Sequence, residues 1–388
     1  MWSLKHLLPV LVFSALVIVT GCASAPPTTI TTESPPVVFN EIWGYLMRGK
    51  ESQLKGTEPF TDICYFSAEV NKDGRITETI PRPQVSSAAG VTPKVFLVVT
   101  ELSNSALSHF ALSPVYGVRP LLVGDIVKVS ADYDGVQIDF EAVSPDDAQP
   151  FWDFLQDLRQ QLPREKMLSV ALPARTTARN DAYAYDKVAP LVDRVMIMAY
   201  DQHWSGSSPG PIASLPWCSR VLENVQSVIP NGKIVMGLPL YGRVWQDKKI
   251  SRALGFEGVQ DILTEKKPAS SYQSDLGPSL QYSENVLVTV FYDDVRSLRE
   301  KLLLYESRKV KSVAFWRIGL SPDELWNSIS TPPAPAAPPA PAAPPATATP
   351  PATATPSAAA TPSAAATPPA AAAPPATGTA PSANPAPP

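Results

Sequence analysis

The chain has 388 residues and a formal net charge of −4, with 44 prolines, three histidines and three cysteines. The negative charge and the lack of a clustered basic face argue against a nucleic-acid binder. The histidines are scattered and no cysteine or histidine spacing is typical of a metal site, so we expect no metal and no other cofactor. Cys64 and Cys218 lie in apolar patterns, and we expect buried free thiols rather than a disulfide.

Residues 1–21 are typical of an export signal. Lys5 and His6 precede the apolar run LLPVLVFSALVIV, which is shorter than a membrane-spanning helix needs. The run ends in VTGC, which resembles the lipobox of bacterial lipoproteins. This resemblance implies cleavage before Cys22 and a lipid on its thiol, which would anchor the exported chain in the bacterial envelope, at the outer membrane or the periplasmic face. An ordinary signal peptide with an incidental cysteine and an uncleaved helical anchor are the alternatives.

Two segments of low complexity flank the central region. Residues 22–37 form a short polar tether, and residues 331–388 form a tail composed almost wholly of Pro, Ala, Thr and Ser. The tail carries no charged or aromatic side chain, so it has too little apolar surface to bury and should stay disordered. Its prolines favour extended, semi-rigid conformations, which indicates a spacer. A glycosylated stalk and a wall-threading segment remain open.

The central region, residues 38–330, alternates short apolar runs with helical patterns. Eight runs are predicted strands: 41–46, 62–69, 94–101, 135–141, 167–174, 194–201, 233–242 and 312–319. Strands that alternate with helices imply a parallel sheet, and the number eight predicts closure into a TIM (β/α)8 barrel of the α/β class. A doubly wound open sheet is the rival fold, but no G-x-G-x-x-G segment opens a helix here.

Two helices stand out, one at 144–162 with Ser144 as the expected cap, the other at 293–309. The gap between the seventh and eighth strands is long. Its mixed pattern predicts a small α+β insertion on the barrel rim, at about residues 245–290.

The segment GVQIDFE places polar residues within one predicted strand. Side chains alternate between the two faces of a strand, so Gln137, Asp139 and Glu141 share one face. They would point into the barrel, with Glu141 at the carboxyl-terminal mouth, where barrel enzymes carry their active sites. Two neighbouring carboxylates resist double ionisation, so one pKa should rise, which suits a proton donor near neutral pH. A polar cluster without chemistry is the alternative.

Four segments together resemble glycoside hydrolase family 18, the chitinase-like hydrolases of N-acetylglucosamine polymers. DGVQIDFE resembles the family's DGxDxDxE signature, VMIMAYD the end of its sixth strand, GLPLYGR its seventh and VAFWRIG its last. They occur in the family's order, and the similarity spans roughly residues 40–328. The stretch YDQHWSGSSPGPIASLPW resembles bacterial members that trim spore cortex and other peptidoglycan.

The resemblance implies a retaining, substrate-assisted hydrolysis of β-1,4 linkages in N-acetylglucosamine-containing glycans. In this mechanism the substrate's own acetamido oxygen attacks the anomeric carbon. If the roles known in the family apply to the matching positions of this sequence, Glu141 is the general acid and base and Asp139 orients the acetamido group. Tyr200 then donates a hydrogen bond to the acetamido oxygen.

The same resemblance implies further contacts to the substrate. Those residues are Asp201 beside Tyr200, Trp316 beneath the sugar ring, Met198 under the same sugar, and Tyr45, Gln137 and Tyr241 around the site. Packing without substrate contact is the alternative for Trp316, Met198 and Tyr241. For His203 and Trp204, a structural role and substrate contact are equally compatible with the pattern.

Two departures from the family pattern leave the substrate and the activity open. Gln137 stands where the family has an aspartate; a glutamine can hydrogen-bond to Asp139 but cannot share a proton with it. The segment KVFLVVTELSN lacks the Ser-x-Gly-Gly of typical chitinases, and with the expected envelope location this favours peptidoglycan over chitin. A catalytically silent glycan-binding or adhesin-like protein on the same fold is the alternative function.

Overall fold

The computed structural model describes residues 34–247, 255–273 and 277–333. The predicted export signal, Cys22, most of the predicted tether and nearly all of the predicted tail lie outside the described residues. Within the described ranges, no helix is both long enough and apolar enough to cross a membrane.

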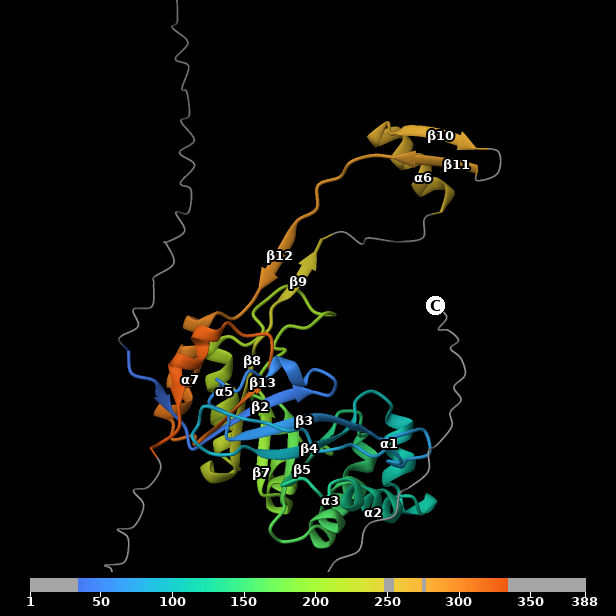
Figure 1. The fold of residues 1–388 in the computed structure, drawn as a ribbon. Coiled ribbons are helices and arrows are strands. Elements are labelled where there is room, and N and C mark those ends of the chain that lie inside the picture. The colour runs from blue at the N-terminus through green and yellow to red at the C-terminus, as the bar shows by residue number, and fades with distance from the viewer. Residues whose placement is uncertain (1–33, 248–254, 274–276, 334–388) are drawn as a thin grey trace, which may run out of the picture. The chain divides into compact units, whose positions relative to one another are not determined.

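A closed barrel of eight parallel strands forms the core of the described chain (Figure 1). In order around the barrel the strands are β13 (Ser312–Trp316), β2 (Glu41–Met47), β3 (Asp62–Glu69), β4 (Lys94–Glu101), β5 (Gly135–Phe140), β6 (Met167–Pro173), β7 (Arg194–Met198) and β8 (Ile234–Pro239). The last strand, β13, closes the barrel by pairing with both β8 and β2. The predicted TIM barrel is therefore confirmed, and the open doubly wound sheet is excluded.

Strand β5 shows how the sequence pattern builds the two layers of the core. Val136, Ile138 and Phe140 belong to the large apolar cluster between the strands and the helices, and Phe140 stacks on Phe154 with ring centroids 5.5 Å apart. Gln137 and Asp139 point the other way, into the barrel. The strand's alternation therefore fixes one apolar and one polar face, as the period of two requires.

A second, smaller apolar cluster fills the barrel interior. Its buried members are Trp43, Tyr45, Cys64, Phe66, Phe96, Val98, Ala171, Met196, Val235 and Ala314. Cys64 lies inside this cluster, whereas Cys218 lies on α5 outside the barrel; both are buried and free, as expected.

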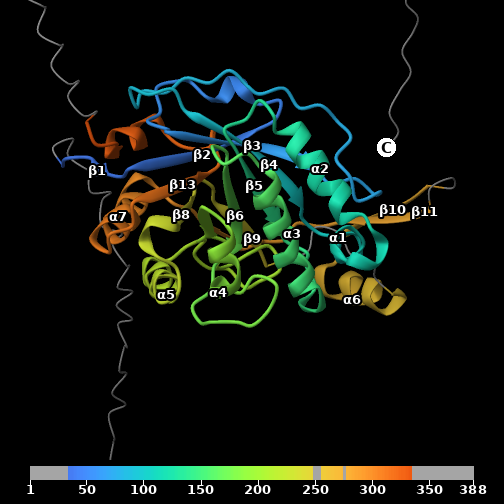
Figure 2. The ribbon, with the colours of Figure 1, turned by 90° about the horizontal axis from the view of Figure 1, so that it is seen from below.

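Helices cover the outside of the barrel (Figure 2). They are α1 (Ser105–Leu112), α2 (Arg119–Val129), α3 (Ala148–Gln161), α4 (Tyr185–Val188), α5 (Leu215–Gln226) and α7 (Val295–Ser307). The predicted alternation of strands and helices fails at the start of the barrel. Among the described residues, β2 is followed by only a 3-10 turn (Glu51–Gln53), and no α-helix joins β3 to β4.

The predicted cap of α3 is wrong. A 3-10 turn, Pro145–Asp147, lies between Ser144 and the helix, and the Ser144 side chain makes no capping hydrogen bond. The turn moves the hydroxyl out of reach of the first free amides of α3. The predicted second helix is confirmed as α7, which begins with a capping box between Asp294 and Ser297.

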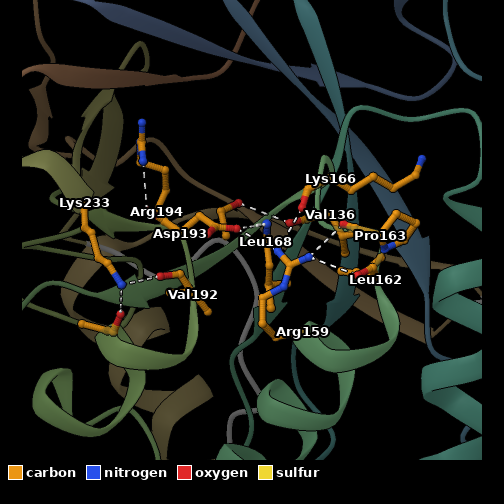
Figure 3. A network of polar contacts seen from close by, with 12 residues as sticks. Val136, Arg159, Leu162, Pro163, Lys166, Leu168, Val192, Asp193, Arg194 and Lys233 are labelled. Carbon is orange, nitrogen blue, oxygen red and sulfur yellow. Dashed lines mark hydrogen bonds and ion pairs between the residues drawn. The ribbon is translucent and has the colours of Figure 1, made fainter.

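Partly buried cations fix the turns at the amino-terminal ends of the strands, opposite the site (Figure 3). Arg159 of α3 donates to the carboxylate of Asp193 and to the carbonyl of Lys166, both at 2.9 Å. Asp193 in turn accepts the backbone N–H of Leu168 at 2.8 Å. The helix, the first residues of β6 and the start of β7 are thereby tied together.

The predicted α+β insertion lies between β8 and α7. It starts with β9 (Arg243–Gln246) and ends with β12 (Val288–Phe291), which pair antiparallel. Between them come α6 (Phe256–Lys266) and a hairpin of β10 (Ala269–Gln273) and β11 (Gly277–Gln281).

Candidate active site

A cavity of about 420 Å³ opens at the carboxyl-terminal ends of the barrel strands. Its lining residues are Tyr45, Phe66, Leu102, Asp139, Glu141, Ala171, Pro173, Ala174, Met198, Tyr200, Asp201, Trp217, Tyr241 and Trp316. This is the end of the barrel at which TIM-barrel enzymes carry their active sites.

Asp139 and Glu141 enter the cavity from the end of β5. Asp139 is 4% exposed, and its Oδ1 atom is buried without a hydrogen-bond partner. Glu141 follows the last paired residue of the strand and is exposed at the mouth, with its backbone N–H bonded to the Glu101 carbonyl at 2.8 Å. The deeper carboxyl and the outer carboxyl therefore meet very different surroundings.

Both carboxyl groups have raised pKa values. Burial, and then the charge of Glu141, raise the pKa of Asp139 to about 8. Burial also raises the pKa of Glu141, and the charges of Asp201 and Glu101 add to this. The deeper carboxyl, Asp139, therefore resists ionisation near pH 7.

Gln137 does not line the cavity and does not bond to Asp139. The Tyr45 hydroxyl donates to its Oε1 at 2.5 Å, and its Nε2 donates to the Ser169 hydroxyl at 3.2 Å. The hydrogen bond to Asp139 that a glutamine could make is therefore absent, and Gln137 lies beneath the cavity without lining it. The pleat sets Gln137 two residues deeper than Asp139, where it is fully buried between β2 and β6.

Three aromatic rings form one wall of the cavity. Trp316 lies at the end of β13, with its ring centroid 5.2 Å from that of Tyr45 and 5.0 Å from that of Phe66. Met198 also lines the cavity and packs against the inner cluster. Such a wall offers flat apolar surface to the C–H side of a sugar ring.

On the other side of the cavity, Asp201 is held by two partners. The Tyr241 hydroxyl and the Arg243 guanidinium donate to its Oδ1 at 2.5 and 2.7 Å. Asp201 has a left-handed backbone conformation, with φ of 56°, which turns the chain after Tyr200. The Tyr200 hydroxyl has no hydrogen-bond partner among the described residues, although the side chain lines the cavity.

His203 and Trp204 lie outside the lining. His203 bonds to the Ser208 carbonyl at 3.1 Å, and Trp204 is 55% exposed. Within the described part of the chain, no group of three acidic, histidine or cysteine side chains could hold a metal ion.

Several lining residues were missed by the sequence reasoning. In the sequence, Phe66 belongs to an apolar run and Trp217 ends the segment YDQHWSGSSPGPIASLPW, and neither pattern indicates a cavity; Leu102, Ala171, Pro173 and Ala174 carry no reactive group. Arg243 was visible in GLPLYGR, but its pairing with Asp201 depends on where β9 starts.

Residues 121–320 match the family described as Glycosyl hydrolases family 18. The chain belongs to glycoside hydrolase family 18. Its fold, with eight parallel strands in a closed barrel, agrees with this assignment.

Relatives in family 18 cover most of the chain. The cortical fragment-lytic enzyme of Bacillus anthracis is 28% identical over 302 residues, 71% of this chain and 70% of the relative. The crystal structure of the Bacillus cereus spore cortex-lytic enzyme SleL has a TM-score of 0.60 at 24% identity, over 77% of this chain and 76% of that one. The crystal structure of a chitinase from Chromobacterium violaceum has a TM-score of 0.58 at 21% identity. The match covers 74% of this chain and 97% of that one.

This family 18 chain is thus a glycoside hydrolase related to spore cortex-lytic enzymes and to chitinases. Of the residues predicted for its site, Glu141, Asp139, Tyr200, Asp201, Trp316, Met198, Tyr45 and Tyr241 all line one cavity, and Gln137 lies beneath it.

Proposed function

We propose that the protein cleaves β-1,4 linkages of N-acetylglucosamine-containing glycans by a retaining, substrate-assisted mechanism. One observation carries the proposal: the side chains with reactive roles lack protein partners, whereas those around them are bonded. No described residue hydrogen-bonds to the side chains of Asp139, Glu141 or Tyr200, although all three line the cavity. The buried Oδ1 atom of Asp139 in particular is costly to leave unpartnered unless a ligand satisfies it.

The substrate supplies the nucleophile in this reaction. Its acetamido carbonyl oxygen attacks the anomeric carbon while the glycosidic C–O bond breaks, and Glu141 gives its proton to the leaving oxygen. Asp139 accepts the acetamido N–H and stabilises the positive charge of the oxazolinium that forms. Tyr200 donates to the acetamido oxygen and holds it against the anomeric carbon. Each such preorganised group is typically worth about 3 kcal/mol in the transition state.

Water then completes the reaction. Glu141, now ionised, takes a proton from a water molecule that opens the oxazolinium at the anomeric carbon. Two displacements at this carbon leave its configuration unchanged. Trp316 supports the sugar ring, and the pair of Tyr241 and Asp201 borders the leaving sugar.

Peptidoglycan is the proposed substrate in preference to chitin. The support is the similarity to cortical fragment-lytic enzymes, which extends over most of the chain, and the expected export to the cell envelope.

The test compares purified wild-type protein with Glu141→Gln and Asp139→Asn on N-acetylglucosamine oligomers and on isolated sacculi. Wild type should cleave at least one of them with retained configuration, and Glu141→Gln should lose about 10³-fold or more in kcat while still binding. Glu300→Gln on the outer face of α7 is the matched control and should match wild type. Oligomers with free amino groups in place of acetamido groups should resist cleavage; rapid hydrolysis of them would contradict substrate assistance.

A silent glycan-binding protein is the second candidate, and Gln137 is the observation that favours it. The amide occupies the place of a family carboxylate and gives Asp139 no partner. If wild type and Glu141→Gln bind the glycans equally and neither releases product, this second function is correct.

We further propose that the chain is exported and lipid-anchored through Cys22 in the bacterial envelope. Labelling of growing cells with an alkyne fatty acid should mark the wild-type chain and leave Cys22→Ala unmarked. Equal labelling of both would refute the anchor.

A further inference from the structure

A second cavity adjoins the catalytic one at the same end of the barrel. It also has a volume of about 420 Å³, and it lies between the ends of β2 and β3 and the loop after β3. Its lining residues are Met47, Arg48, Phe66, Ser67, Glu69 and Glu78. Phe66 lines both cavities, and its ring centroid lies 5.0 Å from that of Trp316, on which the proposed mechanism rests the sugar. A group attached to the glycan beside this sugar therefore has a second cavity within reach.

The second cavity carries one positive and two negative charges. Arg48 donates from Nη2 to the Glu78 carboxylate at 2.8 Å and from Nη1 to the Ser67 carbonyl at 3.3 Å. No hydrogen bond or ion pair joins the Glu69 side chain to another described residue, although its charge acts on Arg48. The net negative charge favours a ligand with an ammonium group, and the remaining N–H groups of Arg48 suit a carboxylate on the same ligand.

The loop that carries Glu78 is anchored outside the second cavity. Arg75 donates to both carboxylate oxygens of Asp125 on α2, at 2.5 and 2.9 Å, and the backbone N–H of Ile76 donates to the same carboxylate at 3.2 Å. On the opposite side, the backbone N–H of Arg48 donates to the Phe66 carbonyl at 2.7 Å. The charges therefore stand on a fixed frame, which lowers the entropy cost of binding a ligand.

The fold depends little on the charges themselves. The side chains of Arg48 and Glu78 are 44% and 40% exposed, and ion pairs exposed to this degree add little to stability. A substitution at these positions therefore reports on ligand binding more than on folding.

We propose that the second cavity binds the stem peptide of peptidoglycan, with the ammonium group of its diamino acid at Glu69 and Glu78 and a peptide carboxylate at Arg48. Chitin has no charged group to place there. In peptidoglycan, N-acetylglucosamine alternates with a sugar whose lactyl group bears a short peptide that contains a diamino acid and free carboxylates. Three extended residues span roughly 10 Å, so the peptide on the neighbouring sugar reaches an adjoining cavity. This inference rests on the proposed function and adds a specificity site to it.

The test uses soluble, uncross-linked peptidoglycan strands and the same strands stripped of their peptides by an amidase. In wild type, kcat/KM should be about 10-fold or more higher on the peptide-bearing strands. Glu69→Gln removes one charge and keeps the shape, and it should bring this ratio towards one through KM rather than kcat. Glu300→Gln on the outer face of α7 is the matched control and should keep the wild-type ratio. A wild-type ratio of one would overturn the proposal.

Acetylation of the free amine on the stem peptide tests the same contact from the substrate side. It should lower kcat/KM of wild type by a factor similar to that of Glu69→Gln, and the two losses should not add, because both remove one contact. This comparison needs only wild type, so it decides even if the variant does not fold. Acetylation without effect on wild type would contradict the ammonium site.

The failure of this inference can be told apart from the failure of the proposed function. If wild type cleaves peptide-bearing and peptide-free strands equally well, the inference fails and the function survives. If wild type cleaves no strand, the proposed function fails, and a titration of the isolated stem peptide into wild type decides the inference. Binding that weakens about 10-fold or more in Glu69→Gln would support the peptide site, and equal or absent binding would overturn it.

Discussion

Replacing Asp139 by asparagine should stabilise the fold while abolishing catalysis. Burial and the neighbouring Glu141 charge raise the pKa of Asp139 from 3.8 to about 8. Between these two values the folded protein holds a proton that the unfolded chain has released. Stability therefore falls as pH rises from about 4 to about 8, which is the reverse of the usual behaviour of an acidic side chain.

The size of the effect follows from the same two values. The raised pKa of Asp139 lowers the free energy of unfolding. The reduction is near zero below pH 4, of the order of 4 kcal/mol at pH 7 and of the order of 6 kcal/mol above pH 8. Asparagine is neutral at every pH and has nearly the same shape, so Asp139→Asn should gain this stability relative to wild type. The protonated carboxyl and the amide leave similar polar atoms unpartnered, so that part of the cost cancels.

Urea unfolding at pH 5, 7 and 9 measures the difference in the free energy of unfolding. The free energy of unfolding of Asp139→Asn should exceed that of wild type by an amount that grows with pH, while kcat is lost at every pH. Asp134, just before the same strand, is the control of opposite sign. Although burial opposes ionisation there, the ion pair with Arg82 and the hydrogen bond from the Val95 N–H hold its pKa below the ordinary value, so Asp134→Asn should destabilise at pH 7. Parallel stability curves for wild type and Asp139→Asn would refute the reasoning.

Further outcomes can be measured directly. Tyr200→Phe removes one hydrogen bond to the acetamido oxygen and should lower kcat by about 10²-fold with unchanged thermal unfolding; an unaltered kcat contradicts its role. Trp316→Ala should weaken glycan binding in a fluorescence or calorimetric titration, because it removes one of the three rings that form the aromatic wall, and equal affinity would show that the ring only packs. Gly135→Ala should destabilise the barrel in urea unfolding, because the new Cβ would lie 2.6 Å from the Met167 carbonyl oxygen. A metal chelator should leave glycan cleavage unchanged, and inhibition reversed by added metal would contradict the mechanism.

The local sequence pattern was sufficient to predict the barrel and the two main carboxylates of the site. The alternation of Val136, Ile138 and Phe140 with Gln137 and Asp139 depends only on the pleat of one strand, so the face that points inward could be predicted. The predicted strands agree with the observed ones to within a few residues. The differences lie mostly at the carboxyl-terminal ends of the strands. At these ends the chain leaves the hydrogen-bonded ladder, and no local signal marks the last paired residue.

The hydrogen-bond partners of these side chains could not be predicted from the sequence pattern in the same way. Gln137 could have bonded to Asp139, but the register of β5 against β6 places Ser169 opposite it, and β2 brings Tyr45 to its other side. Ser144 had the sequence of a helix cap, but a 3-10 turn intervenes. Phe66 and Trp217 reach the cavity from different elements, and only barrel closure brings them there.

The sequence by itself determined which side chains face the interior and which strand carries the acids, because these depend on residues close together in the chain. The tertiary structure decided which of those groups are bonded and which are left free for a ligand. That distinction depends on strand register, burial and contacts between residues far apart in the chain. For this reason the raised pKa of Asp139, which is caused mainly by burial, follows from the closed barrel and not from the sequence pattern.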